Sequence, residues 1–156
     1  MQALHDVRDF IGKADQLYGY PHFLNDASGS FCELDDDSVL DAIARHTVVI
    51  YIEASAEDER FLIERAERSP KPLYYREAFL EEVLPQYMRE HGIEYIVEID
   101  PEHYVRWVFP RLFRARLPRY AAIADRVGYR IPARAAFQVS DPEEFVTLIA
   151  DTLDAG

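Results

Sequence analysis

The segment at residues 22–34, HFLNDASGSFCEL, places an acid and a small-residue turn directly after an apolar run. Asp26 could hold a metal-bound water or a substrate hydroxyl, and the turn Ser28, Gly29 and Ser30 could offer backbone amides and hydroxyls to an anion. Ligands of parallel α/β sheets bind beyond the carboxyl ends of strands, where such a turn would lie. The alternative is a solvated turn that Asp26 caps.

A second group of candidate residues lies in RAERSPKPLYYRE, residues 65–77. Its cations are Arg65, Arg68, Lys71 and Arg76. They surround a proline-interrupted loop between two predicted helices, which suits a mobile lid that brings cations onto a phosphate and excludes water. The alternative is a basic helix end that the macrodipole favours, with Glu64 paired to Arg68.

The third group is a run of arginines at residues 100–130, where seven arginines stand against three acids and give a local charge of +4. Guanidinium groups bind carboxylates and phosphates bidentately, so this cluster favours an anionic small molecule. Arg116 and Arg119 are the preferred candidates because Pro118 fixes the turn between them. The alternative is that these arginines offset the acids of neighbouring helices.

Composition excludes several classes of function. The chain has 156 residues, enough for one domain, and its 17 basic and 29 acidic residues give a net charge of -12. That charge argues against general nucleic-acid binding, so any anion site must be local. No apolar run is long enough to cross a bilayer and no signal peptide is recognisable, so we expect a soluble protein with no membrane partner.

The single cysteine, Cys32, cannot form an internal disulfide, which favours a reducing, cytoplasmic environment. It is expected to be a small buried residue and not a nucleophile, because no histidine lies at a suggestive spacing. The five histidines are scattered, with no pair four residues apart, so no metal site is predicted.

The elements that must position these residues alternate between strand and helix. The β-branched run at 47–52 predicts a central strand covered on both faces. Ser55 caps a predicted helix that has Asp58 as its third residue and runs to about Arg68, and Asp37 caps another over 38–45. The apolar run before Asn25 is also expected to be a strand.

Further along, residues 76–90 predict a helix bent at Pro85, and 94–98 a weak strand. Asp-Pro-Glu sequences at 100 and 141 predict two helix starts. Pro110 and Pro118 are expected to break the segment between them into shorter helices, and 137–139 to form a final strand. The prediction is one α/β domain over 1–156, with a mostly parallel sheet flanked by helices and a lid-like segment near 65–77.

In order, these pieces resemble the later part of a P-loop kinase of the shikimate kinase and nucleoside monophosphate kinase type. The turn at 27–30, the strand TVVIYIEAS, the lid RSPKPLY and the segment RLPRYAAIA at 116–124 carry the resemblance. The chain is also similar to bacterial proteins described only as ATPases, which share the signatures HFxND-G-SxCEL and PKPLYY. The resemblance covers most of the chain from about Tyr20.

The resemblance implies site roles. Asp26 and the following turn would face the acceptor or a metal, Lys71 or Arg68 would reach the phosphates from the lid, and Arg116 would hold an acidic acceptor. Asp26, Lys71 and Arg68 are therefore the candidate catalytic residues, and the candidate substrate-binding residues are Ser28, Gly29, Ser30, Arg116 and Arg119. Lys71 stands where the family usually has arginine.

The chain departs from the family at its front, because it contains no GxxxxGK[ST] loop, the motif that binds nucleotide phosphates and magnesium. Gly12-Lys13 comes closest, but Ala14 follows it. The expected function is the acceptor-site and lid part of a P-loop ATPase or small-molecule kinase, a transferase that uses ATP and Mg only if the missing P-loop region is supplied. The alternative is a noncatalytic domain that binds an anionic metabolite or acidic partner. An uncovered sheet edge would favour a homodimer.

Overall fold

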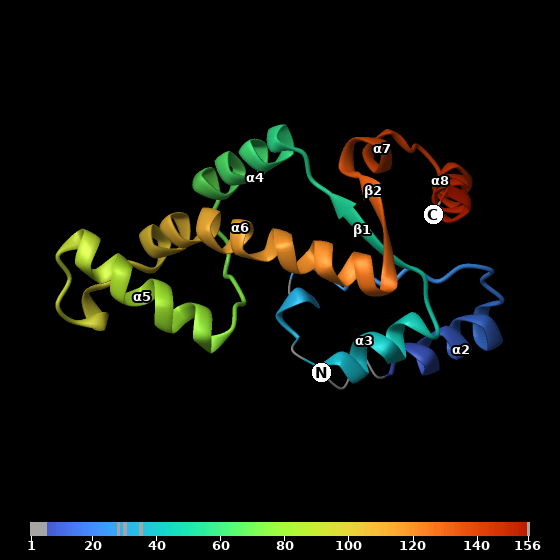
Figure 1. The fold of residues 1–156 in the computed structure, drawn as a ribbon, viewed down its shortest axis with the longest axis horizontal. Coiled ribbons are helices and arrows are strands. Elements are labelled where there is room, and N and C mark those ends of the chain that lie inside the picture. The colour runs from blue at the N-terminus through green and yellow to red at the C-terminus, as the bar shows by residue number, and fades with distance from the viewer. Residues whose placement is uncertain (1–5, 28, 30, 35, 156) are drawn as a thin grey trace.

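The computed structural model describes residues 6–27, 29, 31–34 and 36–155. It shows a mixed α/β protein in which helices surround one small parallel sheet (Figure 1). The elements in chain order are α2 (Val7–Tyr18), η1 (Phe31–Glu33), α3 (Asp37–Ala44), β1 (Val49–Glu53), α4 (Ala56–Arg68), α5 (Glu77–His91), η2 (Ile96–Glu98), α6 (Pro101–Val127), β2 (Gly128–Pro132), α7 (Ala133–Gln138) and α8 (Pro142–Ala155).

Helix α6 is the longest helix of the described residues, and it packs against both strands and against α3, α4, α5 and η1 (Figure 1). It begins at the predicted place, where Asp100 accepts hydrogen bonds from the backbone N–H of Glu102 and His103 and Pro101 takes the first helical position. The predicted breaks at Pro110 and Pro118 are wrong, because the helix runs for 27 residues through both prolines. Packing on so many elements outweighs the backbone hydrogen bonds that the prolines remove.

The sheet consists of β1 and β2, which run parallel with Val49 opposite Gly128 and Ile52 opposite Ile131. Helices α7 and α8 pack on β2, and Ile131 is fully buried. Coverage of β1 is less complete, because Ile52 is 43% exposed and Val48, just before the strand, is 50% exposed. The prediction of a central strand covered on both faces is therefore wrong for the residues that the structure describes.

The starts of α3 and α4 follow local capping rules. Ser55 and Asp58 form the predicted capping box, and α4 ends at Arg68 as expected. The cap of α3 is Asp36 and not Asp37, since the Asp36 carboxylate accepts a hydrogen bond from the Ser38 backbone N–H at 3.0 Å. Both helices are thus fixed by side chains at their own first turns.

Helix α5 and the first part of α6 form a hairpin that projects away from the sheet, whereas the later part of α6 packs on the strands (Figure 1). Val83 and Tyr87 of α5 pack against Tyr104 and Val108 of α6, and the Tyr87 hydroxyl lies 2.7 Å from Nδ1 of His103. Pro85 lies inside a continuous α5. The hairpin tip contains η2 where the sequence predicted a strand.

Two other predicted strands are absent from the structure. Residues 137–139 include the end of α7 instead of a final strand, and Phe137 is exposed. The apolar run before Asn25 lies in irregular structure. Within the described ranges, no helix is both long and apolar enough to span a bilayer.

Candidate functional site

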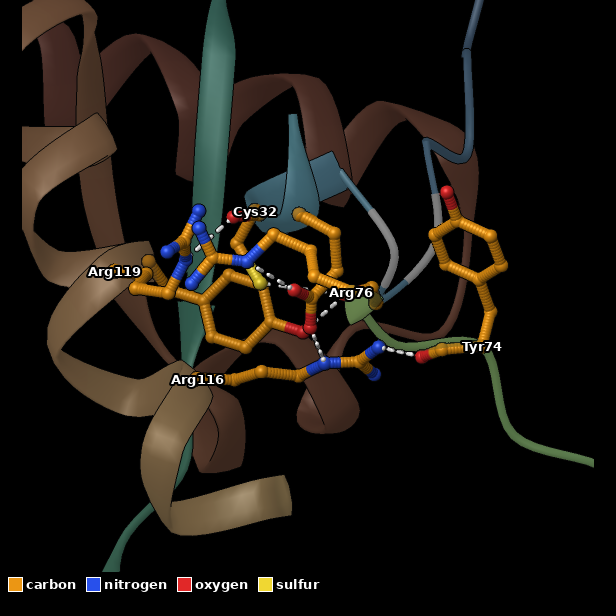
Figure 2. A network of polar contacts seen from close by, with 8 residues as sticks. Cys32, Tyr74, Arg76, Arg116 and Arg119 are labelled. Atoms are coloured by element: carbon orange, nitrogen blue, oxygen red, sulfur yellow. Dashed lines mark hydrogen bonds and ion pairs between the residues drawn. The ribbon is translucent and has the colours of Figure 1, made fainter. Parts of the chain in front are cut away.

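Three segments that are distant in sequence meet around the carboxylate of Glu33 (Figure 2): the short helix η1, the middle of α6 and the loop that leads into α5. The Glu33 side chain is only 4% exposed. Nε of Arg116 donates to its Oε1 at 2.6 Å, and Nε of Arg76 lies 3.2 Å from its Oε2. Each carboxylate oxygen therefore has its own guanidinium partner, an arrangement that offsets the cost of burying the charge.

Arg116 also joins the predicted lid to this site. Its side chain is 14% exposed, and besides its bond to Glu33 it donates through Nη2 to the backbone carbonyl of Tyr74. Tyr74 and Arg76 both lie in the predicted lid-like segment, residues 65–77. The guanidinium group of Arg116 thus connects three elements: α6, to which it belongs, η1 and the end of the lid-like segment (Figure 2).

Two further residues of α6 bind backbone carbonyls of Gly29 and of η1, which together are called the η1 turn below. Nε of Arg119 donates to the Cys32 carbonyl at 2.6 Å, and the Tyr120 hydroxyl donates to the Gly29 carbonyl at 2.6 Å. The turn lies so close to α6 that a Cβ on Gly29 would stand 3.0 Å from the Tyr120 hydroxyl and 3.3 Å from Nη1 of Arg116. Glycine is the residue that permits this approach.

The site lies toward the carboxyl ends of the two strands. The Tyr120 ring stacks on that of Tyr51, at the middle of β1, with 5.5 Å between ring centroids. Strand β2 runs back along α6. It starts at Gly128, directly after the last residue of α6, and Nη2 of Arg130 donates to the Ala121 carbonyl of that helix. The turn of α6 just before Tyr120, which includes Arg116, therefore lies toward the strands' carboxyl ends, where α/β sheets place their ligands.

Cys32 and Tyr120 are both protonated at neutral pH. Burial raises the pKa of the Cys32 thiol above its usual value, which outweighs the lowering effect of a hydrogen bond with Tyr120. Burial also raises the pKa of the Tyr120 hydroxyl, and the hydrogen bond with Cys32 raises it further. Cys32 is buried, as the sequence predicted, and its raised pKa keeps the thiolate scarce.

We predict that Cys32 resists alkylation in the folded protein. Iodoacetamide at pH 8 should modify native Cys32 at least about tenfold more slowly than the same residue in guanidinium, because reaction requires local opening and a thiolate. Mass spectrometry of timed aliquots measures both rates. Equal rates in the two conditions would show that η1 does not bury the thiol.

The structure brings together some of the predicted site residues. Gly29, Arg116 and Arg119 converge on the η1 turn, while Ser28 and Ser30 lie outside the described residues. The candidate catalytic residues Asp26, Arg68 and Lys71 are exposed. Nε of Arg68 donates to the backbone carbonyl of Glu64, the residue named in the alternative helix-end interpretation.

The other five arginines of residues 100–130 all form ion pairs within the protein, in line with the alternative that these arginines offset neighbouring acids. The pairs are Arg106 with Glu102, Arg111 with Glu90, Arg114 with Glu59, Arg126 with Asp37 and Asp41, and Arg130 with Glu53 and Asp125. These ion pairs join α6 to α3, α4 and α5, and Arg130 of β2 joins that strand to β1 and to α6. In this part of the chain, arginine therefore serves largely to hold α6 against acidic neighbours.

Sequence reasoning missed Glu33, the residue at the centre of the site. Its partners Arg76 and Arg116 lie 43 and 83 positions further along the chain, so no local spacing could reveal them. The sequence singled out both of its partners, Arg76 near the lid and Arg116 in the arginine run, but not the glutamate that they share. Among the described residues, no group of three or more histidine, cysteine or acidic side chains could hold a metal ion.

Comparison of the chain with protein-family models, with curated proteins and with solved structures finds no significant match. The class of the protein therefore rests on its own fold, a mixed α/β arrangement with a two-stranded parallel sheet.

Proposed function

We propose that this chain is the acceptor-site and lid part of a P-loop ATPase or small-molecule kinase, in which a separate strand, P-loop and helix supply the nucleotide site. Once completed, it transfers the γ-phosphoryl group of ATP, with Mg, to a small acceptor or to water, mainly by positioning and charge stabilisation. Alone, it shows little or no turnover because it has no GxxxxGK[ST] loop.

The observation that carries this proposal is the incomplete coverage of the parallel sheet. Parallel sheets are normally covered on both faces and have more than two strands. Here α7 and α8 pack on β2, and α7 also contacts β1, yet Ile52 of β1 and Val48 just before it stay about half exposed. A further strand with its helix beside β1 would cover these side chains. We propose that this is where the P-loop unit docks, or where a second copy pairs when that unit is not present.

The position of the Glu33 contacts supports the acceptor role. They lie toward the carboxyl ends of β1 and β2, and Arg116 ties them to the lid-like segment through the Tyr74 carbonyl. In the proposed enzyme, Arg116 holds the acidic group of the acceptor, and Arg68 and Lys71 reach the phosphates from the lid. Asp26 and the turn after it would face the acceptor.

A noncatalytic binding domain is the second candidate, and one observation favours it. The Glu33 carboxylate already lies between two guanidinium groups, at 2.6 and 3.2 Å, so the fold can hold a carboxylate without any nucleotide. In this case an anionic metabolite or an acidic partner binds at the arginine cluster, and no phosphoryl transfer occurs.

Calorimetric titration with ATP and Mg distinguishes the two candidates. It should be done on this chain and on a longer form that carries an in-frame GxxxxGKS region. The phosphoryl-transfer proposal expects no heat of binding from this chain, but saturable binding and ATP turnover from the longer form. Turnover should fall at least about tenfold in Arg116→Ala of the longer form, because the acceptor loses its guanidinium partner.

The matched control for this experiment is Arg114→Ala, two residues away on α6, because Arg114 pairs with Glu59 at the surface. Its turnover should stay near that of the unsubstituted longer form. A longer form that binds no ATP, together with a phosphorylated metabolite that binds this chain, would favour the noncatalytic domain.

A further inference from the structure

The Glu33 carboxylate is held in the way that proteins hold a free oxyanion. Nε of Arg116 donates a hydrogen bond to one oxygen, whereas Nε of Arg76 lies 3.2 Å from the other as an ion pair without hydrogen-bond geometry, and the carboxylate is almost fully buried. Guanidinium groups on separate elements bind the phosphate or carboxylate of a ligand with this two-point geometry. A residue of the chain thus fills a place that would also suit a ligand.

We propose that the space between Arg76 and Arg116 is an oxyanion seat, which Glu33 occupies in the ligand-free chain and which the phosphate or carboxylate group of a ligand takes by displacing Glu33. This inference rests on the proposed function, because it assumes that the ligand belongs to the same site. It adds that the chain carries its own competitor for that ligand.

The anchoring of η1 allows such an exchange. The turn is fixed to α6 through backbone carbonyls, from Cys32 to Arg119 and from Gly29 to Tyr120. These two bonds do not involve the Glu33 side chain. The carboxylate can therefore leave the seat while the turn keeps its position, and an incoming anion keeps both guanidinium charges compensated.

The exchange also controls the order of the lid-like segment. Arg76 reaches the seat from the end of that segment, and Arg116 holds the segment through the Tyr74 carbonyl. An empty seat would leave both arginines without their common anion and loosen residues 69–76. A bound oxyanion restores the bridge, so the segment is ordered by whichever anion fills the seat.

Removal of the competitor tests the proposal on the full chain. Glu33→Ala empties the seat, and isothermal titration with inorganic phosphate or with acetate is done at constant ionic strength with chloride as the balancing anion. We expect phosphate to bind Glu33→Ala at least about tenfold more tightly than it binds the unsubstituted chain, because apparent affinity scales with the fraction of empty seats. Equal tightening by acetate would identify a carboxylate ligand, and tightening by phosphate alone a phosphoryl group.

Hydrogen exchange measured by mass spectrometry gives a second readout. Amides in residues 69–76 should exchange faster in Glu33→Ala, and phosphate should slow them again. Glu59→Ala is the control, because among the described residues the Glu59 carboxylate is seen paired with one arginine, Arg114, and not placed between two. If Glu33→Ala does not fold, Glu33→Gln removes the charge at nearly constant volume and is titrated in the same way.

Two results would overturn the inference. One is phosphate and acetate binding to Glu33→Ala no more tightly than to Glu59→Ala. The other is tighter binding that leaves exchange in residues 69–76 unchanged, which would place the anion elsewhere. Failure of the proposed function is distinguishable, because a longer form without ATP binding leaves the anion exchange at Glu33 intact.

Discussion

Arg116→Ala should lower the free energy of unfolding by about 3 kcal/mol or more, because it removes one of two partners from a buried carboxylate. Of the two arginines that the structure describes beside it, Glu33 would keep Arg76, at 3.2 Å, and the Tyr74 carbonyl would lose the Arg116 donor. For a chain of this size the loss corresponds to a fall in Tm of roughly 6 to 12 °C. Urea titration followed by circular dichroism measures the change.

The control for this prediction is Arg114→Ala, which breaks a surface pair. Arg114 donates to Glu59 at 2.8 Å, but its side chain is 63% exposed, so the loss should stay below about 1 kcal/mol. Equal losses in the two variants would contradict the claim that burial of Glu33 makes the Arg116 contact important.

Gly128→Val should destabilise the protein by about 2 to 3 kcal/mol through overpacking where β1 and β2 meet. A Cβ at position 128 would stand 2.8 Å from the Val49 carbonyl oxygen and 3.2 Å from Val49 Cγ1. The first of these is a backbone atom in the paired strand, so relief requires the strands to separate. Thermal unfolding and hydrogen exchange of the β1 amides report the two effects.

Gly12→Ala is the matched glycine control. Gly12 lies inside α2, and a Cβ there would meet no atom within 4 Å. Because alanine favours helix more than glycine, this variant should gain up to about 1 kcal/mol. A loss in Gly12→Ala similar to that in Gly128→Val would show that the close approach at Val49 is not the cause.

The parts of the fold that could be predicted are those with local causes. The capping box of Ser55 and Asp58, the Asp100 cap and the β-branched run of β1 each depend on residues within a few positions of one another. Tertiary packing decided the rest. Pro110 and Pro118 predicted breaks on local grounds, yet α6 continues through both because neighbouring elements hold it along its length.

Strand β2 shows the same limit. Its sequence GYRIP is short, begins with the glycine that the close approach requires and ends in proline, so no alternation identified it. Its partner is β1, nearly 80 positions earlier, and the pairing exists because α6 returns the chain to that place. Sequence reasoning placed the last strand at 137–139 instead, where helix α7 ends.

The candidate site divides in a similar way. Arg116, Arg119 and Gly29 were selected from composition and turn chemistry, and the structure brings them together. Glu33 could not be selected, because an isolated glutamate beside a cysteine carries no local signal. Its importance arises from burial between two guanidinium groups that only the folded chain brings near it.

The length of α6 has a mechanical consequence. Because an α-helix rises 1.5 Å per residue, Arg116 and the helix start at Pro101 are separated by roughly 22 Å of stiff rod. A tilt of α6 by about 5° around Arg116 would therefore move the start of the helix at Pro101 by about 2 Å. Tyr95, Ile96 and Val97 at the η2 tip are exposed to solvent. A small change in helix angle at Arg116 would therefore produce a larger displacement of this exposed apolar surface.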